Sequence, residues 1–234
     1  MKILFCIDHL RADGTQRVLC QLVAGLAARG HRLTVVCLND SLDEALVREL
    51  CGYGAQLRVV GRRALAGIYG LIGLAWWARA ERFDVAVTML FAADVIGRLV
   101  ARAAGVPRIV SSIRARNINY RLWQLWLVRA TMPLADCVIV NSRASAPFAA
   151  AAEGVPPARL LVIPNAIDPA PYARPYPPAE LRAQLGLAPG RRLLACVGIT
   201  DRGKGDISSA GPVFARRSCP LGTAGPGADL GEVG

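Results

Sequence analysis

The first residue pattern that could do chemistry is a glycine after the opening apolar segment. That segment reads MKILFCID, and Gly14 follows it directly before a predicted helix. Glycine lets the backbone turn tightly and approach a ligand, and free N–H groups at a helix start attract phosphate. The stretch predicts either that Gly14 and Thr15 bind a phosphate or that Thr15 caps the helix of an ordinary turn. It favours neither interpretation.

A basic segment, SSIRARN at 111–117, follows a predicted buried strand. The carboxyl ends of parallel strands form the ligand crevice of an open α/β sheet. Phosphate or acceptor contacts are therefore predicted for Ser112, Arg114, Arg116 and Asn117. A solvated basic loop is the alternative, and the residues alone leave both open.

A third pattern, GITDRGKG at 198–205, nearly matches a phosphate-binding loop of the type G-x-x-x-x-G-K-[ST]. Gly205 stands where the hydroxyl that binds magnesium is required, so a true P-loop is not expected. Lys204 could still meet a phosphate as a point charge. The G-x-G-x-x-G dinucleotide fingerprint is absent, because Gly14 is the only glycine in its loop.

The seven cysteines include no CxxC pair, and their number is odd. A disulfide framework or a zinc site is therefore not expected, and buried reduced thiols are the simpler account. The sequence predicts neither a metal nor a cofactor.

The charge and hydropathy of the chain limit its partners and location. The formal net charge is +11, which favours acidic partners such as nucleotide phosphates or anionic lipid. No nucleic-acid motif accompanies the dispersed arginines, so nucleic acid is not expected. The opening apolar segment is too short for a signal peptide, and no apolar run reaches the roughly 18 residues of a spanning helix. We expect a cytoplasmic protein, peripheral on the inner face of the cell membrane if it binds lipid.

Short apolar runs alternate with longer helical stretches up to about residue 168, and several of these runs are apolar throughout. That pattern is typical of a parallel sheet covered by helices on both faces. It predicts an α/β domain with a doubly wound, Rossmann-like sheet. The predicted strands are 3–7, 32–38, 56–60, 84–90, 108–113, 137–141 and 160–164, and the predicted helices are 16–29, 42–51, 65–80, 92–104, 120–132 and 143–152.

The chain after this domain changes composition twice. Residues 169–178 contain five prolines and predict an extended linker. A helix and a strand at 179–205 predict the start of a second α/β domain. Residues 206–234 hold 6 glycines and 3 prolines in 29 positions, which is typical of an irregular, disordered segment. We interpret this tail as the product of a frame shift near residue 205, or else as a natural flexible tail.

Two apolar stretches could touch a membrane. The stretch 65–78 is apolar all round and contains three glycines, so it is predicted mainly to pack on the sheet. The stretch 120–130 combines Trp123 and Trp126 with flanking arginines, as interfacial helices do. The sequence leaves a membrane helix and a core helix equally open for the second stretch.

Taken in order, the segments resemble family-4 glycosyltransferases, which have the GT-B fold of two facing Rossmann-like domains. The resemblance rests on the opening MKILFCIDHLRADGTQRVLCQLVAGLAARGHRLTVVCL, on GVPRIVSSIR, LADCVIVNS and RLLVIPNAID, and on LLACVGITDRGKG. It covers about residues 1–205. No single motif is strong, but the ordered set is specific.

The resemblance implies transfer of a sugar from a nucleotide-sugar donor to a glycan or lipid-linked acceptor, with retention at the anomeric carbon. It implies that the first domain holds the acceptor and that the Gly14 loop nears the donor phosphates. In the second domain it assigns the donor phosphate to Gly198 and Lys204, but Ile199 stands where the family has an arginine. The family's later pair of glutamates, seven residues apart, has no counterpart here. The resemblance therefore implies a truncated chain that is inactive alone, with a non-catalytic acceptor- or nucleotide-binding module as the alternative.

Overall fold

The computed structural model describes residues 1–61, 67–114 and 120–166, together with positions 169, 173 and 183. By its internal contacts the chain divides into Met1–Ile167 and Asp168–Gly234. The predicted linker, second-domain start and tail lie almost wholly outside the described residues, so that part of the domain organisation stays a prediction.

Seven parallel strands form one sheet in the order β3-β2-β1-β4-β5-β6-β7. The predicted doubly wound α/β fold is confirmed, and each predicted strand end lies within two residues of the observed one. β1 is an interior strand, because Ile3 pairs with Leu33 on one side and with Val85 on the other. The strands are β1 Lys2–Ile7, β2 Arg32–Cys37, β3 Gln56–Val59, β4 Val85–Met89, β5 Arg108–Ile113, β6 Cys137–Val140 and β7 Leu160–Val162.

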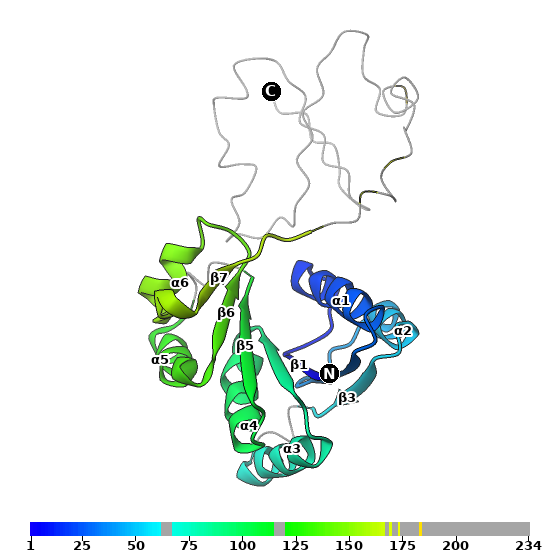
Figure 1. The fold of residues 1–234 in the computed structure, drawn as a ribbon, viewed down its shortest axis with the longest axis horizontal. Helices are drawn as coiled ribbons and strands as arrows, with labels where there is room; N and C mark the ends of the chain where they lie inside the picture. The colour runs from blue at the N-terminus through cyan, green and yellow to red at the C-terminus, as the bar shows by residue number, and fades with distance from the viewer. Residues whose placement is uncertain (62–66, 115–119, 167–168, 170–172, 174–182, 184–234) are drawn as a thin grey trace, which may run out of the picture. The chain divides into compact units, whose positions relative to one another are not determined.

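Helices connect consecutive strands, as parallel pairing requires. α1 and α2 lie on one side of the sheet and α3 and α4 on the other, while α5 and α6 lie beside β6 and β7 (Figure 1). The helices are α1 Gly14–Ala27, α2 Glu44–Gly52, α3 Ile68–Glu81, α4 Arg98–Ala103, α5 Leu122–Thr131 and α6 Ala146–Glu153, with short 3₁₀ turns at Met132–Leu134 and Pro157–Arg159.

The predicted helix 92–104 is two elements, a π-helix η1 at Ala93–Gly97 followed by α4. A Cβ atom on Gly97 would lie 2.9 Å from Thr88 Cγ2 and 3.1 Å from Cys6 Cβ. Glycine at this position therefore lets the π-helix pack directly on β1 and β4. Such π-helical turns are frequent at functional sites.

The expectation of a sheet covered on both faces is only partly correct. β5, β6 and β7 pack one face against α5 and α6. On the other face Val110, Cys137 and Ile139 are half-buried, Leu161 is 49% exposed, and none of the four belongs to a buried core cluster. Among the described residues the helices therefore do not close this half of the sheet, because α1 and α2 pack over β1 and β2.

Candidate functional site

The carboxyl ends of the strands meet at one edge of the sheet. Ile7 pairs with Met89, and Met89 pairs with Ser112. The residues that follow β1, β4, β5 and β6 are therefore neighbours, although up to about 130 positions separate them in the chain. This is the edge at which ligands bind in open α/β sheets.

Arg114 lies at this edge and is fixed by two asparagines from later loops. Its Nη1 donates to Asn165 Oδ1 at 2.8 Å, and its carbonyl oxygen accepts from Asn141 Nδ2 at 3.0 Å. Its Nε is buried and has no hydrogen-bond partner among the described residues. Burial lowers the pKa of this guanidinium from its ordinary value. Arg114 is thus a positioned cation whose Nε–H group remains available to donate a hydrogen bond.

Ser112 lies next to this arginine but is only 2% exposed, and its Oγ has no partner among the described residues. Its side chain is on the sheet face that carries Val110 and Ile139. The prediction that it contacts a ligand remains a prediction. Arg116 and Asn117, and likewise Gly198 and Lys204, fall outside the described residues.

Gly14 is the first residue of α1, and a Cβ atom placed on it would meet nothing within 4 Å. The N-cap position belongs to Asp13, whose side chain makes no capping hydrogen bond. The alternative in which Thr15 caps the helix is therefore wrong, because Thr15 lies inside the first turn. No described side chain caps the amide groups at the start of α1, and the space around Gly14 is open.

The sequence prediction missed Asp8, which directly follows β1. Its carboxylate accepts hydrogen bonds from the backbone amides of Ala92 at 3.0 Å and Ala93 at 2.6 Å, where η1 begins. Burial raises the pKa of Asp8, and the two amide bonds oppose that shift. Leu90, which directly follows β4, has a φ of 75°, a left-handed conformation that costs energy for a branched residue. The backbone distortion at the end of β4 thus accompanies the amide–carboxylate contact.

His9 and Gln16 form a second contact that the sequence did not reveal. Gln16 is 1% exposed, and its Nε2 lies 3.0 Å from the carbonyl oxygen of His9 and 3.1 Å from His9 Nδ1. This contact joins the loop after β1 to the first turn of α1. The Oε1 of Gln16 is buried without a partner among the described residues.

A closed polar cluster lies beneath the edge, between β4, β5 and α5. Arg98 is fully buried; its Nε donates to Ser111 Oγ at 2.7 Å, and its Nη2 lies 3.2 Å from Asp94 Oδ1. Asp94 also accepts from Thr88 Oγ1 at 2.5 Å. Burial raises the pKa of Asp94, while Arg98 and Thr88 oppose the shift. We call Thr88, Asp94, Arg98 and Ser111 the closed network.

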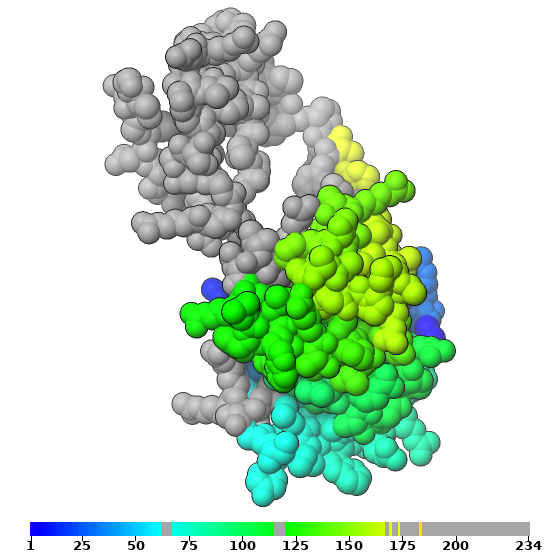
Figure 2. All heavy atoms as spheres, turned by 90° about the vertical axis from the view of Figure 1, so that its left-hand side faces the viewer, coloured from blue at the N-terminus to red at the C-terminus, as the bar shows by residue number. Residues whose placement is uncertain are grey.

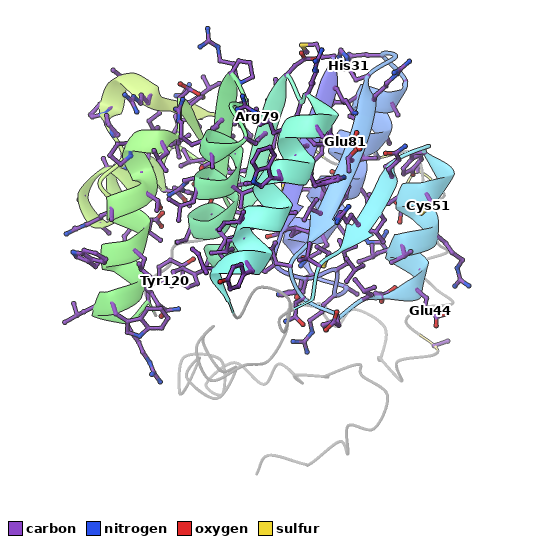
Figure 3. The ribbon with its side chains drawn as sticks, turned by 90° about the horizontal axis from the view of Figure 1, so that it is seen from below. His31, Glu44, Cys51, Arg79, Glu81 and Tyr120 are labelled. Atoms are coloured by element: carbon purple, nitrogen blue, oxygen red, sulfur yellow. The ribbon has the colours of Figure 1, made fainter. Side chains whose placement is uncertain are left out.

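The cysteine prediction is partly wrong. Cys6, Cys20 and Cys37 are buried and free, and burial raises the pKa of each thiol. Cys51 is exposed, because it lies on the outer side of α2 (Figure 3). Over the described residues no group of three or more His, Cys, Asp or Glu side chains is arranged to hold a metal.

The two apolar helices both expose large side chains. α3 packs on the sheet through one face, where Leu74 and Ala78 join a core cluster with strand residues such as Leu4 and Val36, as expected for 65–78. Its opposite face exposes Tyr69 and Trp76. A Cβ atom on Gly67 or Gly73 would meet nothing within 4 Å, so these glycines do not serve close approach.

α5 buries Val128 and Thr131 and exposes Leu122, Trp123 and Trp126. Figure 2 views the side of the molecule on which α5 and α6 lie. Tyr120 precedes α5 (Figure 3), and its ring contacts Phe91 edge-on at 5.3 Å. In the described part of the chain no helix is long and apolar enough to cross a membrane.

Comparison with known families decides the relationship. The sequence profile of Glycosyltransferase Family 4 matches residues 12–171, more than half of the chain. The chain belongs to this family. The matched region runs from the loop before α1 past Asn165 and so contains most of the edge described above.

Solved structures agree in fold. The Anabaena protein HepE, solved with UDP and glucose, has a TM-score of 0.63 and 21% identity over 80% of this chain and 50% of its own. A Rickettsia africae glycosyltransferase has a TM-score of 0.61 and 13% identity over 81% and 50% of the two chains. The lipopolysaccharide outer core galactosyltransferase WaaB has a TM-score of 0.54 and 14% identity over 72% and 46%.

The chain thus spans about half the length of these structures. The sheet and its flanking helices match GT-B glycosyltransferases. None of the curated proteins compared with the chain matches it significantly.

Proposed function

We propose that this protein acts in a retaining glycosyltransferase, which moves a sugar from a nucleotide-sugar donor to a glycan or lipid-linked acceptor. The described residues form the acceptor-side domain. The observation that carries the proposal is the family match over residues 12–171, which includes both the Gly14 loop and Arg114. These two features lie at the same edge of the sheet.

The described residues contribute charge and dipoles that are in place before a ligand arrives. The start of α1 offers N–H groups next to open space at Gly14, which suits a phosphate oxygen. Arg114, held by Asn165, offers a buried Nε–H to an acceptor oxygen or a phosphate. Groups positioned in this way stabilise developing charge without reorganising during the reaction.

Donor binding in this proposal also uses Gly198 and Lys204, which carry the family's basic turn. No metal or cofactor is part of the proposal, because a lysine, an arginine and helix amides can neutralise a leaving diphosphate. Since Ile199 replaces the family's second cation, we expect this chain alone to turn over slowly. Losing one preorganised charge contact commonly costs about 10²–10³ in rate.

The experiment tests binding and transfer separately. UDP-glucose is the first probe, because HepE was solved with UDP and glucose. Calorimetry with the purified chain should show binding that Arg114→Met weakens about tenfold or more and that Arg102→Met leaves unchanged. NMR of any transfer product reports whether the anomeric configuration is retained.

Each outcome of this experiment has a distinct meaning. Binding without transfer to any sugar or lipid-linked acceptor favours the alternative, a non-catalytic acceptor- or nucleotide-binding module. The proposal is wrong if no member of a panel of nucleotide sugars binds. Turnover at about one per second, an ordinary enzyme rate, would overturn only the expectation of slow catalysis.

We also propose that α5 makes a peripheral contact with the anionic inner face of the cell membrane. Leu122 and Trp126 are 87% and 67% exposed and lie four residues apart, so they share one face of the helix. Arg121 lies at the start of the helix and is exposed, where anionic headgroups would meet it. Arg129, in the last turn, instead donates to the carbonyl oxygens of Ala151 and Ala152. Tryptophan rings favour this depth of a bilayer because one side of the ring is apolar and the N–H remains polar.

Vesicle flotation with phosphatidylglycerol tests this contact. Leu122→Ser with Trp126→Ala should release the protein from the vesicles at low salt. Tyr69→Ala with Trp76→Ala, on the exposed face of α3, is the matched control and should not. Release only by the α3 variant would move the contact to α3, and no binding by the wild type would contradict the proposal.

A further inference from the structure

The contact between Gln16 and His9 determines which ring nitrogen of His9 carries the proton. A backbone carbonyl oxygen can only accept a hydrogen bond, so the Gln16 atom 3.0 Å from the carbonyl of His9 must be the amide nitrogen. That NH₂ group has a second hydrogen, and His9 Nδ1 lies 3.1 Å from the same nitrogen. Nδ1 must therefore accept. A neutral His9 then carries its proton on Nε2.

The other side of the ring is free to meet a ligand. His9 is half-buried, and its Nε2 has no hydrogen-bond partner among the described residues. Nδ1 faces the first turn of α1, so Nε2 points away from Gln16. The ring lies beside a helix start that no described side chain caps and that has open space at Gly14.

We infer that His9 is a ligand-binding residue that donates its Nε2–H to a phosphate oxygen, and that Gln16 is the positioning residue that fixes this tautomer. The ligand part rests on the proposed function, since the phosphate is that of a nucleotide sugar. The tautomer part does not, because it follows from the two Gln16 contacts. A phosphate is favoured over a sugar hydroxyl because the positive end of the α1 dipole lies beside the ring.

A purely structural role for Gln16 makes different predictions. Gln16 could simply tie the β1–α1 loop to the helix, in which case any side chain that preserves folding would serve. If Gln16 sets the tautomer, Gln16→Glu must change it, because a carboxylate oxygen would face the carbonyl of His9 and would favour a proton on Nδ1. Methionine has nearly the same shape as glutamine but neither donates nor accepts a strong hydrogen bond. Gln16→Met should therefore leave the two tautomers of His9 mixed.

The first experiment measures the tautomer without a ligand. Long-range ¹H–¹⁵N NMR at about pH 8 reports both ring nitrogens of each histidine, and this chain has only His9 and His31. A His31→Asn variant assigns the signals. We expect the Nε2–H form for His9 in the wild type and a loss of that form in Gln16→Glu. A predominant Nδ1–H form in the wild type, or an unchanged tautomer in folded Gln16→Glu, overturns the role of Gln16.

The second experiment adds ligands to the same samples. UDP and pyrophosphate should both shift the His9 Nε2 signal, and glucose alone should not. A shift with glucose and none with pyrophosphate would assign the donor to a sugar hydroxyl and would overturn the phosphate assignment. If UDP binds without moving His9, the ligand role of His9 is wrong while the proposed function survives.

Affinity of UDP for His9 variants provides the final comparison. His9→Ala removes a donor to a charged oxygen, which should weaken UDP binding about 10–100-fold. His9→Gln places an amide N–H near the position of Nε2 and should recover part of the affinity, whereas the shorter His9→Asn should not. His31→Asn is the control. Failure of UDP and of every nucleotide sugar in the panel to bind the wild type rejects the proposed function and the ligand role together, and leaves the tautomer result to stand alone.

Discussion

Two groups of buried polar side chains differ in how their hydrogen bonds are satisfied. One is the closed network, and the other lies at the carboxyl edge of the sheet. In the closed network, Arg98 donates from Nε to Ser111 and from Nη1 to Val128 and Thr131. Its Nη2 makes no hydrogen bond in the described part of the chain but is ion-paired with Asp94 Oδ1 at 3.2 Å. At the carboxyl edge, Gln16 Oε1, Ser112 Oγ and Arg114 Nε are buried without a partner among the described residues.

The difference separates structural from functional polar groups. A buried polar atom without a partner costs about 1–3 kcal/mol, so such atoms persist where another requirement outweighs stability. The closed network joins β4, β5, η1 and α5, and its one donor nitrogen without a hydrogen bond within the described ranges, Arg98 Nη2, is neutralised by the ion pair with Asp94. The edge retains unpaired atoms beside Gly14 and Arg114, where we propose that substrates bind.

The largest effect is expected from opening the closed network. Arg98→Met should lower the free energy of unfolding by about 3–5 kcal/mol, because it leaves the Asp94 carboxylate buried without its cation. Urea denaturation measures this. Arg102→Met, on the exposed side of the same helix, should change it by about 0.5 kcal/mol or less. A loss below about 1 kcal/mol for Arg98→Met would mean that the network does not hold the fold.

A smaller effect is expected where η1 touches the sheet. Gly97→Ala should destabilise the protein by about 1–3 kcal/mol, because its Cβ atom would press on Thr88 and Cys6. Gly73→Ala on α3 should instead stabilise it by about 0.5–1 kcal/mol, since alanine is the better helix former and the space there is open. Thermal unfolding of both variants should therefore show shifts of opposite sign.

The thiol beneath Gly97 should make stability depend on alkaline pH. Burial, with a smaller contribution from the charge of Asp8, raises the pKa of Cys6 from 9.0 to about 12. Between these values the unfolded chain loses the proton and the folded chain keeps it. Each pH unit then lowers the free energy of unfolding by up to about 1.4 kcal/mol.

Cys6→Ser should remove that part of the pH dependence, because serine does not ionise in this range. The measurement is urea denaturation at pH 9, 10 and 11. Cys51→Ser is the control, since Cys51 is exposed. Equal slopes for the wild type and Cys6→Ser would contradict the shifted pKa.

Two neighbouring serines provide the sharpest comparison, and the second of them should show the smallest effect. Ser111 accepts a hydrogen bond from Arg98, so Ser111→Ala should cost about 1–3 kcal/mol. Ser112 faces the other side of the sheet without a partner, so Ser112→Ala should change stability by about 0.5 kcal/mol or less. Similar losses for both would show that the Ser112 hydroxyl is satisfied in solution.

Much of the fold could be predicted from local patterns. Apolar runs alternate with helical stretches at a spacing that only a parallel α/β sheet satisfies easily, and this placed Ser112 and Arg114 at the correct edge. The split of 92–104 into η1 and α4 could not be predicted, because it depends on the contact of Gly97 with two strands. The exposure of Trp76 also escaped prediction, since α3 has no polar face to mark its outer side.

The site was predicted less well than the fold, for a physical reason. Asp8 is bound by amides 84 and 85 residues later in the chain, so no local pattern reveals its role. Gln16 occupies a helical position typical of a solvent-facing residue, yet its amide turns inward to His9. Only the polar sequence of that loop, with His9, Arg11 and Asp13 between a strand and a helix, hinted that it does more than connect them.

The interior position of β1 has a consequence for synthesis on the ribosome. Its second neighbour, β4, begins about 82 residues later, as the bond between Lys2 and Asp84 illustrates. The ribosome adds about 5–20 residues per second, so one edge of β1 stays unpaired for roughly 4–16 s. During this time the nascent chain presents the apolar strand Ile3–Ile7, which other chains can pair with. Chaperone binding to the first 90 residues should therefore determine the yield of this protein more than the stability of the finished sheet.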